Sequence, residues 1–296
     1  MAVRPAAAVY SCFLNPAPHG ESASREFLVG LEQGGSAAAG PMSRIHSREW
    51  ISSDRNIIRL LMTSVCGNQN ALYVCIAALA SVLLNEPAAA QEHVRIHTQD
   101  GADIAADIYG SGSRGVVLAH GGRFTKADWA PQAALLAAHG FHVLAFDFRG
   151  FGESLAPSSP EHTEENARLD VLAAVRYLHV HGAQTVSVVG ASFGGSAAAD
   201  ASADSAPGEI DRVVLLAHGS SNHPELIKGR KLFIVSRHDT DGSGTVRLTE
   251  MREDYERVPP PKHFVVLEGS AHAQFIFKTS QGDRLMNEIL EFLEAP

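Results

Sequence analysis

Ser192 stands at the centre of a Gly-x-Ser-x-Gly pattern that directly follows a short apolar run. The run is Val-Ser-Val-Val, and the glycines of the pattern are Gly190 and Gly194. Glycines two residues before and after a serine permit the tight strand-to-helix turn that lifts its hydroxyl clear of a sheet. A serine presented in this way is typical of an acyl-transfer nucleophile. Because glycine and serine are common, this prediction depends on partner residues elsewhere in the chain.

An acidic residue and a histidine follow Ser192 along the chain, and each comes within five residues of the end of an apolar run. Asp239 follows Leu-Phe-Ile-Val, and His272 follows His-Phe-Val-Val-Leu. A histidine can take the proton of a serine hydroxyl, and an acid can hold the histidine in the required tautomer. Asp241 is the alternative acid, two residues further along a Gly-rich loop. His238 is a rival base, but it adjoins Asp239 on one loop, where serving the same serine is geometrically awkward.

Apolar runs alternate with helix-like segments from Gln91 onward. An opening antiparallel pair is predicted at 93–97 and 104–109, joined near Asp100-Gly101. The runs that read as strands buried on both faces are 115–119, 141–146, 185–189, 212–217, 232–235 and 263–267. The helical segments lie near 128–139, 162–181, 193–204, 244–257 and 281–293. This alternation predicts an α/β fold with a mostly parallel central sheet and helices on both faces.

The order serine, acid, histidine at successive strand ends resembles the α/β-hydrolase superfamily over essentially all of residues 91–296. Two further motifs carry the resemblance. Ala-His-Gly-Gly at 119–122 stands where the family has its oxyanion loop, and Asp-Phe-Arg-Gly-Phe-Gly-Glu-Ser at 147–154 is similar to the family's D-x-R-G-x-G-x-S stretch. The resemblance implies that the backbone N–H groups of Gly122 and Phe193 form the oxyanion hole. One departure is Ser236, where the family usually has a glycine three residues before the acid.

The loop that carries a cap in many family members is short in this chain. Residues 218–230 alone separate Ala217 from Lys231, so we expect no cap domain and an open site. By analogy with the family, an open site suits small or extended esters better than long buried lipids. The residues expected to line a substrate pocket flank the oxyanion loop and the histidine: Arg123, Phe124, Gln274 and Phe275.

Composition excludes several other classes of function. The formal net charge is −9, and an acidic chain without basic clusters is a poor nucleic-acid binder. All three cysteines precede residue 91, so residues 91–296 can form neither a disulfide nor a thiolate metal site. The histidines on predicted strand-end loops lack the spacing of a metal site: His218, His223 and His238. We therefore expect no metal and no cofactor.

The first 90 residues differ from the rest of the chain. Residues 1–61 are rich in Ala, Gly, Ser and Pro, which predicts a disordered extension or a segment upstream of the true translation start. Residues 62–90 hold a 14-residue apolar run at 71–84, followed by Asn-Glu-Pro and Ala-Ala-Ala. This pattern favours a signal peptide cleaved after Ala90 over an apolar helix that packs on the domain or anchors it, and the run is short for a membrane span. With a functional signal the protein would be exported to the periplasm or medium, and otherwise it would be cytoplasmic.

Export makes one prediction that can be checked directly. The exported protein should begin near Gln91, because the Ala-Ala-Ala stretch supplies the small residues that signal peptidases require. Intact-mass and N-terminal peptide mass spectrometry of the exported protein measure this. A mature N-terminus elsewhere contradicts the signal-peptide assignment.

The sequence as a whole predicts a cofactor-free serine hydrolase, an esterase that acts through an acyl-serine on small-molecule esters. A peptidase or thioesterase of the same fold is open as a variant. A catalytically silent α/β-hydrolase domain used for binding is the alternative from a different class. We expect no nucleic-acid partner and no stable membrane span in the mature form, and the sequence makes no prediction of oligomeric state.

Overall fold

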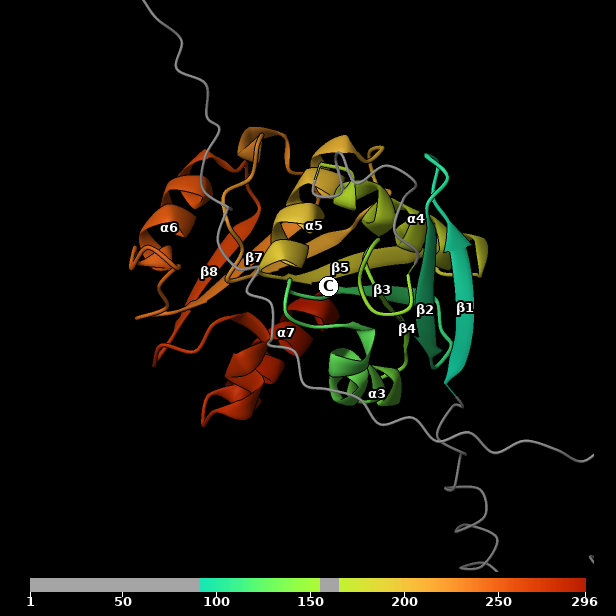
Figure 1. Ribbon diagram of the computed structural model, residues 1–296, viewed down its shortest axis with the longest axis horizontal. Coiled ribbons are helices and arrows are strands. Elements are labelled where there is room, and N and C mark those ends of the chain that lie inside the picture. The colour runs from blue at the N-terminus through green and yellow to red at the C-terminus, as the bar shows by residue number, and fades with distance from the viewer. Residues whose placement is uncertain (1–90, 155–164) are drawn as a thin grey trace, which may run out of the picture. The chain divides into compact units, whose positions relative to one another are not determined.

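The computed structural model describes residues 91–154 and 165–296, which form an eight-stranded sheet between two layers of helices (Figure 1). The predictions for residues 1–61 and 62–90 fall outside the described residues and stay predictions. Within the described ranges, no helix combines the length and apolar character needed to cross a membrane.

The sheet is mixed, with one antiparallel end and a long parallel part. Its strand order is β1-β2-β4-β3-β5-β6-β7-β8, with β2 antiparallel to both β1 and β4 and every later pairing parallel. The strands are β1 (Glu92–His97), β2 (Asp103–Tyr109), β3 (Arg114–Ala119), β4 (Phe141–Phe146), β5 (Thr185–Ala191), β6 (Arg212–Leu216), β7 (Arg230–Ser236) and β8 (Lys262–Leu267). The predicted opening hairpin and mostly parallel α/β sheet are therefore confirmed.

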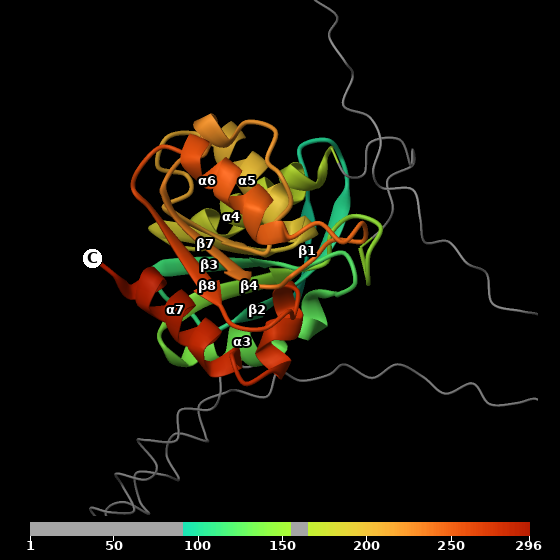
Figure 2. The same ribbon diagram turned by 90° about the vertical axis from the view of Figure 1, so that its left-hand side faces the viewer.

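Helices cover both faces of the sheet, as the near-continuous burial of the parallel strands requires. Figure 2 shows α3 and α7 on one face and α4, α5 and α6 on the other. The helices are α3 (Ala130–Ala138), α4 (Ala167–Val180), α5 (Phe193–Asp204), α6 (Arg247–Arg257) and α7 (Gly282–Glu294), with short 3-10 turns η1 (Lys126–Trp129), η2 (Pro224–Leu226) and η3 (Ala273–Lys278). Each layer closes its own apolar core against the sheet.

The connection between β6 and β7 contains a single 3-10 turn, η2, so no cap domain is inserted there. β6 ends at Leu216, one residue earlier than its apolar run suggests. Ala217 is fully buried but adopts φ 46°, a left-handed conformation that cannot continue a strand. Apolar character thus extended the predicted strand past the point where its backbone turns.

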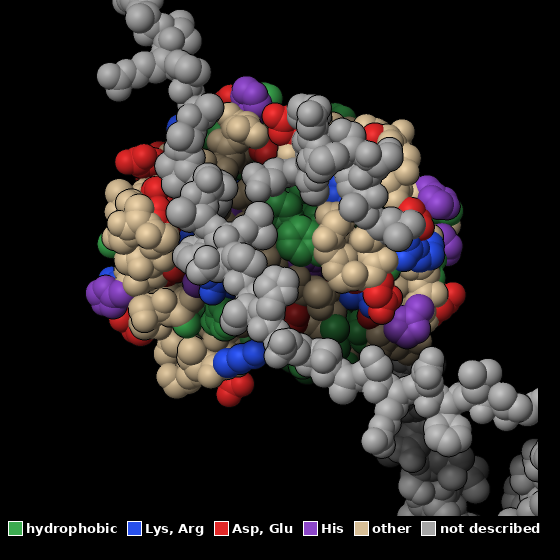
Figure 3. Space-filling model, viewed as in Figure 1, with side chains coloured by type: hydrophobic (Ala, Val, Ile, Leu, Met, Phe, Trp, Pro, Cys, Tyr) green, Lys and Arg blue, Asp and Glu red, His purple; other side chains and the backbone are tan. Residues whose placement is uncertain are grey.

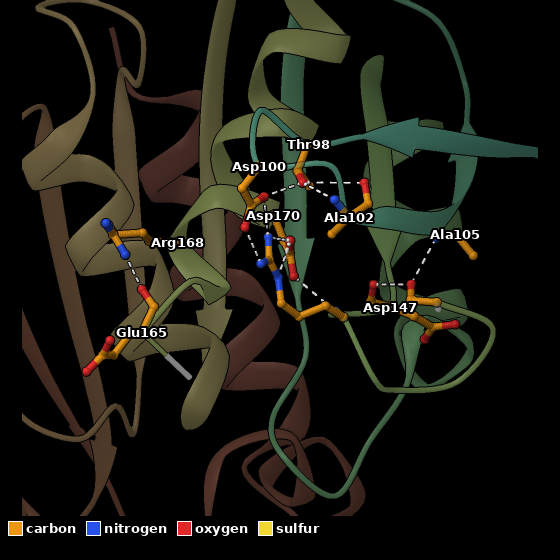
Figure 4. A network of polar contacts seen from close by, with 10 residues as sticks. Thr98, Asp100, Ala102, Ala105, Asp147, Glu165, Arg168 and Asp170 are labelled. Atoms are coloured by element: carbon orange, nitrogen blue, oxygen red, sulfur yellow. Dashed lines mark hydrogen bonds and ion pairs between the residues drawn. The ribbon is translucent and has the colours of Figure 1, made fainter. Parts of the chain in front are cut away.

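A buried arginine ties the loop after β4 to two other parts of the chain. Arg149 is 1% exposed; its Nη1 lies 2.5 Å from Asp100 Oδ2, and its Nη2 lies 2.6 Å from Asp170 Oδ1. Asp100 lies in the β1–β2 turn and Asp170 in the first turn of α4, and Figure 4 shows the two carboxylates close together. The arginine of the D-x-R-G-x-G-x-S stretch is therefore a structural brace.

The aspartate and serine of the same stretch hold the loop from its other side. Asp147 accepts hydrogen bonds from the backbone N–H groups of Lys126, at 2.7 Å, and Glu153, at 2.9 Å. Ser154 Oγ donates to the Asp147 carbonyl and accepts from the N–H of Ala105 on β2, at 2.9 Å. These contacts fix the loop after β4 relative to the start of η1, which follows the predicted oxyanion loop.

Candidate active site

Ser192 occupies a sharp turn between β5 and α5. Its backbone is strained, with φ 51° and ψ −115°, and its N–H donates to the Leu216 carbonyl at 2.8 Å. A Cβ on Gly190 would lie 2.3 Å from the carbonyl oxygen of Gly194, and one on Gly194 would lie 2.4 Å from that of Ala119. Both glycines are required because backbone approaches them too closely for a side chain. The local geometry is that of the predicted elbow.

The side chains of Ser192, His272 and Asp239 are joined by two hydrogen bonds. His272 Nε2 lies 2.7 Å from Ser192 Oγ, and His272 Nδ1 lies 2.8 Å from Asp239 Oδ2. Since a carboxylate only accepts, Nδ1 carries the proton and Nε2 is free to accept from the hydroxyl. The serine lies at the end of β5, the acid follows β7, and the histidine follows β8. The sheet brings together all three of the residues predicted from the sequence.

The two alternative candidates lie elsewhere in their loops. Asp241 Oδ1 accepts from the backbone N–H groups of Ser243 and Thr245, at 2.8 and 2.9 Å, and so closes a local turn. His238 is exposed, and its N–H donates to the Gly269 carbonyl at 2.9 Å. Of the two aspartates, Asp239 is the one that contacts His272.

Asp239 is 1% exposed, and its carboxylate has few polar partners besides His272. Its Oδ1 has no hydrogen-bond partner among the described residues, and the nearest cation is Arg247, whose Nε lies 3.7 Å from Oδ2. The Arg247 N–H also donates to the Asp239 carbonyl at 2.9 Å. Ser236 Oγ donates to the Ala271 carbonyl at 2.7 Å, which links the end of β7 to the residue before His272. The departure from the family's glycine at this position thus adds a contact between two of the loops.

The loop after β3 lies beside the elbow. A Cβ placed on Gly122 would lie 3.8 Å from Phe193 Cβ, so the two residues predicted to form the oxyanion hole are neighbours. The backbone N–H of neither residue donates to another atom of residues 91–154 or 165–296. Two free N–H groups beside a serine hydroxyl are the arrangement that stabilises a developing oxyanion.

His120 braces this loop. Its Nδ1 lies 2.8 Å from the Gly121 carbonyl, and its Nε2 lies 3.1 Å from the backbone N of Phe148. Nδ1 therefore carries the proton and Nε2 accepts, as in a neutral imidazole. Burial lowers the pKa of His120 below its usual value, which keeps the ring neutral. The position of His120 before two glycines indicated a role in this loop. Its contact with the loop after β4 could not be predicted from the sequence.

The four predicted pocket residues separate into two groups. Phe124 and Phe275 pack together, with ring centroids 4.8 Å apart, and Phe275 is 39% exposed. Arg123 is also exposed. Gln274, in contrast, is only 4% exposed, and its Oε1 accepts from the Gly121 N–H at 2.8 Å. Figure 3 shows hydrophobic side chains reaching the surface in the middle of the face seen in Figure 1.

In the part of the chain that the structure describes, no three His, Cys, Asp or Glu side chains are grouped to hold a metal ion. The hydrogen-bonded serine, histidine and carboxylate can perform nucleophilic acyl transfer by themselves. The histidine can accept the serine proton, the buried carboxylate can stabilise the imidazolium that forms, and the unpaired N–H groups belong to Phe193, at the start of α5, and to Gly122, on the loop after β3.

Comparison with known sequences identifies the fold and several distant relatives. The alpha/beta hydrolase fold family matches residues 115–240. The non-heme chloroperoxidase of Streptomyces lividans is 32% identical over 123 residues, 41% of this chain and 43% of the relative. The protein phosphatase methylesterase 1 of Mus musculus is 32% identical over 110 residues, 36% of this chain and 28% of the relative. The chain thus spans less than half the length of these curated relatives.

Solved structures resemble a larger part of the chain. An esterase from Pyrococcus furiosus superposes with a TM-score of 0.60 at 21% identity and covers 69% of this chain and 92% of its own. The esterase EaEST from Exiguobacterium antarcticum gives a TM-score of 0.57 at 13% identity and covers 69% of this chain and 100% of its own. At these identities the likeness extends to the fold alone.

Proposed function

The chain belongs to the α/β-hydrolase superfamily, and on that premise we propose that it is a serine hydrolase that cleaves carboxylic esters. The observation that carries the proposal is the pair of hydrogen bonds through which His272 joins Ser192 to Asp239. The distant relatives include enzymes named as esterases, which agrees with the same reaction class.

The proposed reaction has two halves. His272 Nε2 takes the proton of Ser192 as Oγ attacks the ester carbonyl carbon, and the carbonyl oxygen becomes an oxyanion held by the N–H groups of Gly122 and Phe193. The tetrahedral intermediate collapses, the imidazolium gives its proton to the departing alkoxide, and an acyl-serine remains. Water then attacks the acyl carbon with His272 as base, which releases the carboxylic acid and restores the hydroxyl. Asp239 stabilises the imidazolium in both halves.

The substrate proposal rests on the surroundings of the serine. The short β6–β7 connection leaves this side without an inserted cap, which suits small or extended esters. Phe275 offers an exposed aromatic ring that packs on the buried Phe124 after the oxyanion loop, and Arg123 adds an exposed positive charge beside Phe124 in the chain. Hydrolysis of a panel of nitrophenyl esters, with acyl groups from acetyl to phenylacetyl, measures the acyl preference. We expect faster hydrolysis of esters with the larger apolar groups, and equal rates across the panel would contradict the substrate proposal.

A fluorophosphonate probe tests the nucleophile directly. We expect the folded protein to be labelled once, at Ser192, because a hydroxyl hydrogen-bonded to histidine attacks the probe while ordinary serines do not. Peptide mass spectrometry locates the label, and hydrolysis of an ester should stop as labelling completes. Ser192→Ala should give no label. Ser220→Ala, which removes an exposed serine from the loop after β6, should be labelled like the wild type.

The outcome also separates the alternatives. A folded wild-type protein that takes up no label would be a binding domain and not a hydrolase. A labelled protein that cleaves thioesters or peptides but no oxygen esters would keep the nucleophile and change the substrate class.

A further inference from the structure

Both polar groups of the Gly121 backbone are held by buried side chains or backbone. Its N–H donates to Gln274 Oε1 at 2.8 Å. Its carbonyl accepts from His120 Nδ1, at 2.8 Å, and from the Phe124 N–H, at 3.0 Å. In a trans peptide the carbonyl of one residue and the N–H of the next point in opposite directions. Fixing the Gly121 carbonyl therefore fixes the direction of the Gly122 N–H, one of the two oxyanion donors proposed above.

Gln274 reaches this loop from the turn that carries the histidine. It stands two residues after His272, and the residue between them, Ala273, is fully buried with φ 50°. A left-handed backbone at a residue with a side chain is costly and persists where the surroundings enforce it. The carboxamide bridges segments that are 153 residues apart in the chain, and so connects the base to the oxyanion loop.

The orientation of the carboxamide follows from its contacts. Oε1 accepts from Gly121, whereas Nε2 is buried and has no hydrogen-bond partner among the described residues. Turning the amide over would place Nε2 against the Gly121 N–H, donor against donor. The Gln274 side chain thus keeps the hydrogen bond from Gly121 to Oε1, although Nε2 is left unpaired.

We propose that Gln274 is a positioning residue that aligns the oxyanion loop with the nucleophile and its base. Gln274 holds the N–H of the His120–Gly121 peptide and so fixes the position of the loop, while His120 and Phe124 hold the next peptide, which carries the Gly122 N–H. Together these contacts keep the Gly122 N–H directed at the oxyanion while the turn that carries Gln274 presents His272 to Ser192. This inference rests on the serine hydrolase activity proposed above and assigns to Gln274 a role other than contact with substrate.

The test replaces the acceptor while keeping the volume of the side chain. Gln274→Met should lower kcat about tenfold to a hundredfold with KM within about twofold of wild type. A misdirected Gly122 N–H stabilises the transition state less well but leaves substrate binding unchanged. Gln274→Glu should recover most of kcat, since a carboxylate oxygen also accepts from the Gly121 N–H. Gln132→Met makes the same exchange on α3 and should leave kcat unchanged. The end-point stoichiometry of fluorophosphonate labelling supplies the concentration of active sites.

A trifluoromethyl ketone gives a second readout, because it binds by forming an oxyanion on the serine. Its inhibition constant should rise in Gln274→Met by the same factor by which kcat/KM falls. Should that variant not fold, Gln274→Asn keeps the amide on a side chain one methylene shorter and should show the same two effects.

Three results would overturn the inference while leaving the hydrolase intact. One is a raised KM with unchanged kcat, which makes Gln274 a substrate contact. Another is a lowered Tm with unchanged kcat per active site, which makes it structural only. The third is a Gln274→Glu variant no more active than Gln274→Met. A wild-type protein that takes up no fluorophosphonate would instead remove the proposed function itself.

Discussion

Asp239→Asn is expected to lower kcat about ten-thousandfold while the protein stays folded. Asp239 accepts the Nδ1 proton of His272, at 2.8 Å, and its side chain is 1% exposed. An asparagine can turn its amide to donate to Nδ1, which favours the tautomer with the proton on Nε2. In that tautomer Nε2 cannot accept from Ser192. Steady-state hydrolysis of a nitrophenyl ester measures the loss.

Asp241→Asn is the matched control, because it makes the same change two residues further along the same loop. Asp241 accepts from backbone N–H groups of its own turn and does not contact His272. Its loss should alter the local turn and leave kcat near the wild-type value. If Asp241→Asn loses activity and Asp239→Asn keeps it, the acid has been assigned to the wrong residue.

Arg149→Met is expected to destabilise the fold by about 3–5 kcal/mol, because it leaves a buried carboxylate without its counter-charge. Asp170 is fully buried, and the arginine donates to it from Nε, Nη2 and its own backbone N–H. Arg168→Met breaks an ion pair with Asp204 whose members are 33% and 52% exposed, and should cost less than about 1 kcal/mol. Urea unfolding followed by circular dichroism measures both. Equal losses of unfolding free energy in the two variants would contradict the role of Arg149 as a structural brace.

The cost of Arg149→Met should also depend on pH. Hydrogen bonding to Arg149 lowers the pKa of Asp100 to about 2. A carboxyl whose pKa is lower in the folded state contributes stability above its unfolded pKa, and that contribution disappears as pH falls through the folded pKa. Burial acts on Asp170 in the opposite direction and raises its pKa. Asp170 therefore takes up its proton at a higher pH than Asp100 does. The contribution of Asp100 makes wild type and variant converge as pH falls from about 4 to about 2, and a difference that widens over this range would contradict this account.

The strand ends were predictable because apolar runs that are buried on both faces stand out from the loops that follow them. That pattern placed Ser192, Asp239 and His272 at one edge of the sheet before any contact was known. It could not choose between Asp239 and Asp241, since both follow the same strand by a few residues. The Asp-Gly-Ser-Gly-Thr stretch at 241–245 was a usable signal: a short polar turn gives its first carboxylate local N–H partners.

The supporting contacts lay beyond the reach of the sequence. Arg149 meets Asp100, 49 residues away, and Gln274 meets Gly121, 153 residues away, and no periodicity or motif relates either pair. Gln274 was predicted to line a pocket because it follows the histidine closely. The structure buries it instead, directly after Ala273, whose backbone is left-handed with φ 50°. Such contacts are set by tertiary packing, which a single sequence does not display.

The placement of His272 after β8 has a consequence for how activity is gained and lost. Among the described strands β8 is an edge strand paired with β7 alone, and the nucleophile is 80 residues earlier in the chain, at the centre of the sheet. Contacts between residues so distant in sequence form late in folding, and edge elements open more readily than central ones. A molecule with its central strands paired but β8 detached would look largely native by circular dichroism and yet lack its base. Loss of activity on warming should therefore precede loss of the sheet, so residual turnover would be the more sensitive measure of nativeness.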